Sequence, residues 1–264
     1  MLTYNRATII LFLLLSYILT FSVSSQTITV AFPQNIPPWV MQSQDRGISI
    51  DIVSQAMKTQ GINIVPYYIP FARMTSILEQ EGINAVAMVE GNKIAARYYS
   101  DTTSYFYTSL ISLAKHNFHL TELSNLYNKR IMAFQDASKV FVDLAELAKN
   151  STHYQEIANQ ENQVALLFKG RVDFILIDKS IFHYWRNKIS KVDTSKKVIF
   201  HDVSLIGSIP IKSPTHVVFK SKRTRDAFNK GLQSLIQNGQ YQRIIDGYIK
   251  RAFNNGNDSQ NGNS

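Results

Sequence analysis

The sequence contains no cysteine among its 264 residues. This absence excludes disulfide bonds, thiolate metal ligands, a cysteine nucleophile and a lipid anchor attached through an N-terminal cysteine. A chain of this length can bury enough apolar surface to fold without covalent cross-links. Its stability and its function must therefore come from packing, hydrogen bonds and charged groups.

Acidic residues are also few, with 19 Asp and Glu against 28 Lys and Arg and a formal net charge of +9. The basic residues are scattered along the chain, whereas a nucleic-acid surface needs them concentrated on one face. We therefore expect no nucleic acid partner. Catalytic motifs are equally scarce: there is no G-x-S-x-G motif, and His116 and His119 have no third ligand in a zinc pattern. No metal, no cofactor and no catalytic residue is predicted.

Long apolar runs are missing after the first 25 residues. The run from Ala7 to Leu15 follows the single charge of Arg6, and small residues follow it at Val23–Ser25. The run is shorter than the ~20 apolar residues of a membrane span, and the order is typical of a secretory signal peptide. We expect residues 1–25 to be removed and the protein to be periplasmic. Residues 254–264 contain no apolar side chain and are expected to form a disordered tail.

Strand and helix patterns alternate along the rest of the chain, which predicts an α/β fold built from βαβ units. The expected strands are residues 27–32, 63–68, 85–89, 130–134 and 172–177. A helical pattern opens at Gly47, and further helices are expected at 72–80, 139–148, 162–169, 180–189, 224–238 and 241–253, with Asp136 as a helix N-cap. Two extended segments, 109–115 and 213–219, are predicted to cross between two halves of the molecule.

The candidate binding residues follow from the positions of the strands. In open α/β sheets, ligands bind at the carboxyl ends of the strands. Trp39 and Phe71 lie after predicted strands and can flank an apolar or cationic group. Ser138 stands at a helix start, where backbone N–H groups can hold an anion. Asp178 ends a buried strand and can pair with an ammonium group.

Several segments, in this order and spacing, resemble family 3 periplasmic solute-binding proteins of the amino-acid-binding type. They are Pro38–Trp39 with Gly47–Asp51, Leu78–Ala85, Tyr99–Asp101, Gly170–Asp173 with Asp178, and Phe228–Asn229 with Gly239–Tyr241 and Ile244. The resemblance implies a two-lobed type II periplasmic-binding-protein fold with two hinge crossovers. Lobe 1 would comprise residues 26–112 and 213–253, and lobe 2 residues 113–212.

The resemblance also implies roles for individual residues. Phe71 falls where the family packs an aromatic ring on the ligand, and Asp178 where an acid takes the ligand's α-ammonium. Asp136 and Ser138 fall at the helix start that helps to hold the α-carboxylate.

The chain departs from the family between Met88 and Tyr99, where the family has small or hydroxyl residues and then an arginine that clamps the carboxylate. Here Glu90 occupies the first part, and either Lys93 or Arg97 falls near the arginine position. Lysine cannot make the same two-bond clamp. Arg73 could supply a cation from the other side, while Glu90 and Asp178 together favour a positively charged ligand.

The expected function is capture of a small polar solute, an amino acid or a related amine, in an interlobe cleft by hinge closure. The resemblance implies a monomer that delivers its solute to a membrane permease of the ABC class. Two alternatives remain open at this point. The protein could be the periplasmic component of a sensor, or a small cyclohexadienyl-dehydratase-like enzyme on the same fold.

Overall fold

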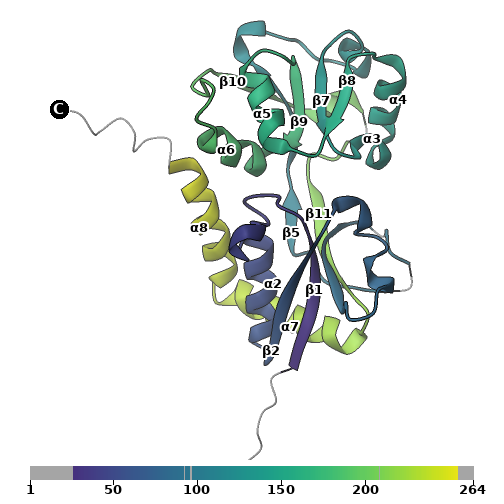
Figure 1. The fold of residues 1–264 in the computed structure, drawn as a ribbon, viewed down its shortest axis with the longest axis vertical. Helices are drawn as coiled ribbons and strands as arrows, with labels where there is room; N and C mark the ends of the chain where they lie inside the picture. Colours follow the sequence, from purple (N-terminus) through teal and green to yellow (C-terminus); the bar gives the residue numbers. More distant parts are fainter. Residues whose placement is uncertain (1–25, 92, 96, 208, 255–264) are drawn as a thin grey trace, which may run out of the picture.

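The computed structural model describes residues 26–91, 93–95, 97–207 and 209–254. The expected signal peptide and residues 255–264 of the expected tail lie outside the described residues. The chain forms two lobes, each with its own sheet, one above the other in Figure 1. None of the helices in the described ranges combines the length and apolar character that a membrane span needs.

The first sheet has six strands and includes the first described residue, Gln26, at the start of β1. Its order is β2-β1-β3-β11-β4, and β5 pairs with β11. The strands β2, β1 and β3 are parallel, and β11 runs antiparallel to β3. Two helices, α2 (Ile48–Lys58) and α7 (Lys222–Gln237), pack against each other in this lobe. The strand bounds are β1 Gln26–Pro33, β2 Ile62–Ile69, β3 Ala85–Glu90, β4 Tyr98–Tyr99, β5 Ser104–Phe106 and β11 Ser213–Phe219.

The second sheet has five strands in the order β10-β6-β9-β7-β8. The parallel strands β8, β7 and β9 form one side, and every residue of β9 is buried, as in parallel sheets covered on both faces. The strand bounds are β6 Thr108–Leu113, β7 Ile131–Phe134, β8 Tyr154–Ile157, β9 Phe174–Asp178 and β10 Val198–His201. The helices are α3 Ala137–Val140, α4 Val142–Asn150, α5 Gln160–Phe168 and α6 Lys179–Lys188.

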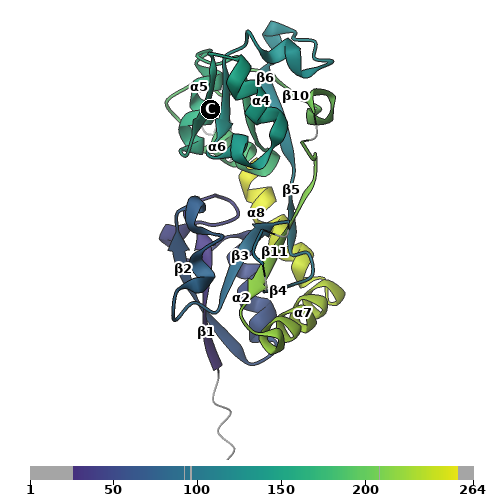
Figure 2. The same ribbon diagram turned by 90° about the vertical axis from the view of Figure 1, so that its right-hand side faces the viewer.

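The expected strands near residues 27–32, 63–68, 85–89, 130–134 and 172–177 are confirmed as β1, β2, β3, β7 and β9. The expected crossovers at 109–115 and 213–219 are wrong. Most of the first is β6, which pairs with β9 and β10 inside the second sheet, and the second is β11, which pairs with β3 inside the first. The chain changes sheets at Tyr107, between β5 and β6, and returns just before β11 (Figure 2). The expected lobe boundary at 112 falls within β6, and we propose Tyr107 as the dividing residue.

Two expected helices differ in the structure. Residues 72–80 form two short 3-10 turns, Phe71–Arg73 and Ile77–Glu79, in place of one helix. The apolar residues Met74, Ile77 and Leu78 are nevertheless buried, because a spacing of three or four residues suits both geometries. The helix expected at 139–148 is divided into α3 and α4 by Phe141, whose backbone is extended at φ −119° and ψ 123°. We attribute the interruption of the helix to burial of the Phe141 ring.

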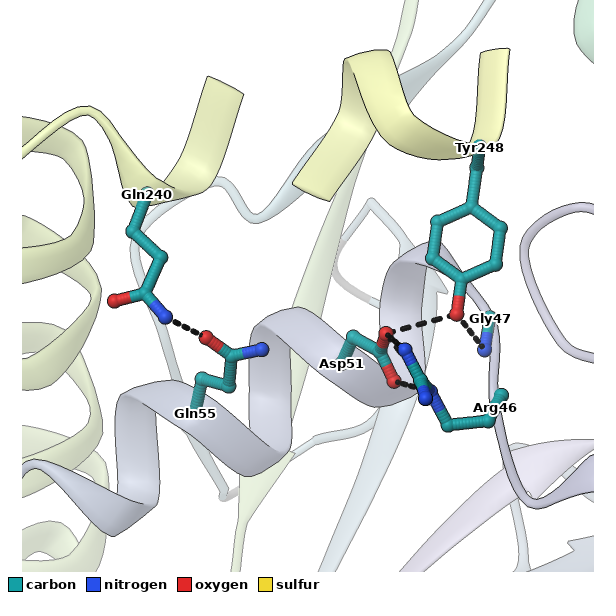
Figure 3. Close-up of polar contacts among 6 residues, drawn as sticks. All are labelled: Arg46, Gly47, Asp51, Gln55, Gln240 and Tyr248. Carbon is teal, nitrogen blue, oxygen red and sulfur yellow. Dashed lines mark hydrogen bonds and ion pairs between the residues drawn. The ribbon is translucent and has the colours of Figure 1, made fainter. Parts of the chain in front are cut away.

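The C-terminal helix α8 (Gln240–Asn254) contacts α2 and α7 of the first lobe and α6 of the second. Figure 3 shows how it is fixed to the first lobe. The Tyr248 hydroxyl donates to Asp51 Oδ2 at 2.8 Å and accepts the Gly47 N–H at 3.1 Å. Arg46 donates to both Asp51 oxygens, so this buried carboxylate has a charged partner. At the other end of α8, the Gln240 side chain donates to Gln55.

Gly47 sets the path of the loop that carries Trp39. Its φ is +144°, and a Cβ at this position would lie 2.3 Å from the Trp39 carbonyl oxygen. The Ser49 N–H donates to the same oxygen at 3.0 Å. Only glycine allows this backbone approach. The start of α2 therefore holds Trp39 in place beside the hinge.

Candidate ligand-binding site

A cavity of about 400 Å³ lies between the two lobes, within the size range of small-molecule sites. Much of its wall comes from the last residues of β3, β7, β8 and β9 and from the segments that follow β1, β2, β7 and β8, the strand ends at which ligands bind in open sheets. The rest comes from Phe106, Thr108 and α6. The first lobe contributes Gln34, Asn35, Ile36, Pro70, Phe71, Glu90 and Phe106. Past the hinge, the second contributes Thr108, Phe134, Gln135, Phe141, Ile157, Ala158, Asn159, Gln160, Glu161, Asp178, Ile181 and Trp185.

Three of the nine residues expected from sequence line this cavity: Phe71, Glu90 and Asp178. Their roles as ligand contacts stay predictions. The other six, Trp39, Arg73, Lys93, Arg97, Asp136 and Ser138, are not among the residues that line it. The contacts of each residue explain this division.

Asp178 is buried at the end of β9 and caps α6. Its Oδ1 accepts the backbone N–H groups of Ser180 at 2.9 Å and Ile181 at 3.1 Å. Its Oδ2 accepts the N–H of Tyr107, the hinge residue, at 2.7 Å. Burial raises the pKa of Asp178, and the four hydrogen bonds it accepts act in the opposite direction. The carboxylate is thus a structural acceptor as well as part of the cavity wall.

Trp39 supplies the fourth of these hydrogen bonds from behind the wall. Its Nε1 donates to Asp178 Oδ1 at 3.3 Å, and its ring packs edge-on against Phe106 with centroids 5.4 Å apart. Trp39 is only 4% exposed. It therefore joins the first lobe to the second at the hinge and supports the wall instead of forming it.

Glu90 reaches the cavity because β3 contains a bulge. Met88 has φ 63°, an uncommon value for a residue other than glycine, and the pairing of β3 with β11 slips at this point. Ala87 and Met88 consequently pack into the same hydrophobic cluster, although neighbouring residues of a strand normally point to opposite faces of the sheet. After the bulge, Val89 and Glu90 therefore point to the faces opposite to those that an unbroken strand would give them. Burial raises the pKa of Glu90, the nearby Lys93 lowers it, and Asp178 raises it.

The three candidate cations do not face the ligand space. Arg97 is paired with Glu79 at 2.8 Å, and Arg73 and Lys93 are exposed. Among the described residues, no lysine, arginine or histidine lines the cavity, whereas Glu90, Glu161 and Asp178 do. The cavity wall therefore carries only negative formal charge.

The helix start at Asp136–Ser138 is already occupied by a carboxylate of the protein. Glu156 Oε1 accepts the Ser138 N–H at 2.7 Å and the Tyr154 hydroxyl at 2.8 Å. Asp136 adopts a left-handed conformation at φ 64°, makes no capping hydrogen bond with its side chain, and pairs with Lys139 at 2.6 Å. The expectation that Asp136 caps this helix through its side chain is wrong, because an αL backbone does not present the carboxylate to the helix N–H groups.

Sequence reasoning missed most of the aromatic wall, which comprises Phe106, Phe134, Phe141 and Trp185 besides Phe71. One signal was available, because Ile181 and Trp185 lie four residues apart on α6 and share a helix face. Phe134 also ends a predicted strand, where cavity residues are expected. Phe106 and Phe141 depend on the position of the hinge and on the break between α3 and α4, which local patterns do not reveal.

The comparisons with known proteins agree with this architecture. Residues 28–251 match the model of the bacterial extracellular solute-binding proteins, family 3. No curated protein sequence matches the chain. Three similar solved structures, all below 25% sequence identity, support the fold alone.

The first is an amino acid ABC transporter substrate-binding protein from Streptococcus pneumoniae bound to L-arginine, with TM-score 0.67, 14% identity and coverage of 87% of this chain and 97% of that one. The second, the GluR0 ligand-binding core with L-glutamate, has TM-score 0.66 and 14% identity over 86% and 99% of the two chains. The third, a histidine kinase sensor domain, has TM-score 0.66 and 15% identity over 84% and 95%. Since the family model covers most of the sequence, the chain belongs to the bacterial extracellular solute-binding proteins, family 3.

Proposed function

We propose that this protein is exported by a cleaved signal peptide and captures one small polar solute in the cavity between its lobes. The observation that carries the proposal is the cavity itself, whose wall comes from both lobes at the carboxyl ends of their strands. A solute held there touches both lobes at once. Its contacts with both lobes therefore stabilise the closed form of the protein.

The hinge contacts support closure as the way in which binding is transmitted. Tyr107 donates to Asp178 and accepts the Lys179 N–H at 3.0 Å, so the crossing residue is fixed to the start of α6. Trp39 reaches the same carboxylate from the first lobe. A change in the angle between the lobes must alter the Trp39 hydrogen bond, which joins the two lobes beside the cavity.

The closed form is presented to a membrane partner by a monomeric binding protein. A permease of the ABC class is the partner that we propose first, because one similar structure is the substrate-binding protein of an amino acid ABC transporter. Delivery to a sensor is the second candidate, and it is favoured by the similarity to a histidine kinase sensor domain. Both functions use the same solute-dependent closure and no covalent step.

Thermal unfolding of the mature chain, residues 26–264, against a panel of solutes tests the proposal. The panel contains amino acids, amines, dicarboxylates, sugars and, for the enzyme alternative, prephenate and arogenate. A ligand at about one hundred times its Kd adds about 2.7 kcal/mol to the free energy of unfolding. For a chain of this size, the melting temperature then rises by about 5–10 °C.

A variant that fills the cavity provides the control. Ala158 is exposed and lines the cavity, so Ala158→Trp should abolish the ligand-induced rise, whereas Ala148→Trp at an exposed position on α4 should preserve it. If no solute class raises the melting temperature, or if Ala158→Trp binds like the parent, the cavity is not the binding site. Conversion of prephenate or arogenate to product would support the enzyme alternative and contradict the proposal that the protein only binds its solute.

A further inference from the structure

We propose that the cavity selects an organic cation without a carboxylate: an ammonium group attached to an apolar or aromatic body. This inference rests on the proposed function and names the ligand class for the same site. It follows from three features of the described wall, namely its acidic groups, its lack of a cationic side chain, and its aromatic residues.

The charged groups of the wall are all acidic. Glu90 and Asp178 come from opposite lobes, and Glu161 adds a third carboxylate from the first turn of α5. Asp178 already accepts four hydrogen bonds, three of them at Oδ1. Glu161 is exposed, whereas Glu90 is only partly exposed at the end of β3, so we assign Glu90 as the carboxylate that pairs with a ligand ammonium. Lys93 is close enough to influence Glu90, but it is exposed and not part of the wall, so water screens its charge.

A carboxylate on the ligand would find no partner in this wall. The Ser138 N–H is taken by Glu156, and Arg97 is paired with Glu79. Arg73 is exposed and not part of the wall. A ligand carboxylate would therefore lose its water and approach Glu90 and Asp178 without a cationic partner, which opposes binding.

The aromatic wall suits the remainder of such a ligand. Phe71 and Phe106 come from the first lobe, and Phe134, Phe141 and Trp185 from the second. Aromatic faces attract a cation and also bury apolar surface, and the attraction is stronger where water is excluded. Aromatic rings on both lobes can thus enclose the body of the ligand while Glu90 pairs with its ammonium group.

Titration calorimetry with matched pairs tests the inference, using tyramine and tyrosine, cadaverine and lysine, and choline and glycine betaine. The members of each pair share a cationic nitrogen and differ in whether they carry a carboxylate. We expect at least one amine to bind about tenfold or more tightly than its carboxylate-bearing partner, since an unpartnered charge dominates such a difference. An amino acid that binds as tightly as its amine overturns the inference.

Two acidic variants locate the contact. Glu90→Gln should weaken the amine by about tenfold because it removes the counter-ion, whereas Glu81→Gln, the same change at an exposed position outside the wall, should not. Unchanged affinity in Glu90→Gln overturns the assignment.

The inference and the proposed function fail in different ways. If a sugar, a dicarboxylate or an amino acid binds in place of an amine and Ala158→Trp abolishes that binding, the inferred cationic ligand is refuted. The proposed solute-binding function then still holds. No binding by any member of the panel refutes both.

Discussion

Two helices of the second lobe, α3 and α6, begin at neighbouring strands and each has a carboxylate at its start. At α6 the carboxylate is Asp178, the N-cap residue itself, which accepts N–H groups two and three residues ahead. At α3 it is Glu156, which comes from β8, 18 residues beyond Ser138. Asp178 lines the cavity, and Glu156 does not.

The two helix starts differ in where the carboxylate comes from. Asp178 is the local carboxylate, from the residue next to the helix, whereas Glu156 is the tertiary carboxylate, from a different strand. A helix start has unpaired N–H groups and attracts an anion from any source. At α6 the chain supplies that anion within one turn, whereas at α3 the parallel pairing of β7 with β8 places Ala133 opposite Glu156 and brings the side chain within reach. With both starts occupied by the protein's own carboxylates, no ligand anion is required there.

Removal of the local carboxylate should have the largest effect. Asp178→Ala loses the cap of α6 and leaves the buried donors of Trp39 and Tyr107 without an acceptor. We expect the free energy of unfolding to fall by about 3 kcal/mol, of which the cap contributes about 1 kcal/mol. The melting temperature should fall by about 6–12 °C in differential scanning calorimetry.

The control is Asp202→Ala, which removes a cap of similar geometry at an exposed site, where Asp202 Oδ1 accepts the Ser204 N–H. Its effect should be clearly smaller. Equal losses in the two variants would mean that the bonds of Asp178 to the hinge contribute nothing. Asp178→Asn is a poor probe of ligand charge. The side-chain amide of the asparagine would point its N–H groups at the N–H donors whose hydrogen bonds Asp178 now accepts.

Removal of the tertiary carboxylate should be milder and should leave specificity unchanged. Glu156→Ala exposes the Ser138 N–H and removes one hydrogen-bond acceptor, which lowers the free energy of unfolding by about 1–2 kcal/mol. The ratio of tyrosine to tyramine affinity should stay the same in calorimetric titrations, since neither Glu156 nor Ser138 lines the cavity. Glu146→Ala, which removes the acceptor of the Tyr127 hydroxyl elsewhere in the lobe, is the matched control and should also leave the ratio unchanged.

The pH dependence of binding tests the charge of Glu90. Burial raises the pKa of Glu90 above 4.5, so its negative charge is lost at a higher pH than that of an ordinary glutamate. Amine affinity should fall as the pH is lowered through that raised pKa. The groups that influence the pKa of Glu90 are Lys93 and Ser213, which lower it, and Asp178, which raises it and whose own pKa burial also raises.

The stability of the ligand-free protein should respond in the opposite direction. A raised pKa in the folded state means that ionised Glu90 disfavours folding, so its protonation at low pH stabilises the fold. Relative to Glu90→Gln, the parent should gain stability as the pH falls while it loses amine affinity. Parallel decreases in both quantities would place the titrating group elsewhere.

The smallest effect should follow from loss of the Asp136–Lys139 ion pair at the start of α3. Lys139 is exposed, and exposed ion pairs contribute little to stability. Lys139→Ala should change neither the melting temperature nor the affinity for an amine measurably. A clear loss of affinity would show that this helix start contributes to the site after all.

Local patterns were enough to predict much of this molecule. Buried apolar runs identified β3 and β9, and the helical spacing of apolar residues identified α5, α6, α7 and α8. Asp178 could be placed at the cavity because it follows a buried strand. Residues 72–80 were misassigned since α-helices and 3-10 turns bury the same spacing of apolar residues.

The candidate site was harder to predict because side-chain partners decide it. A sequence shows Arg97, Asp136 and Ser138 near the positions that the family uses, but it does not show that Glu79, Lys139 and Glu156 already engage them. Nor does it show that a bulge at Met88 turns Glu90 towards the cavity. Each of these facts depends on which strands are neighbours and in which register.

The sequence by itself determined the fold class, the family and the strand ends at which the cavity lies, because burial patterns and helix spacing act over a few residues. Only the tertiary structure decided that the chain changes sheets at Tyr107, that aromatic rings from both lobes line one cavity, and that the charged side chains of its described wall are all carboxylates. These features arise from contacts between segments far apart in the chain. The physical reason is that charge pairing and strand register are set by distances in space, which separation along the sequence does not fix.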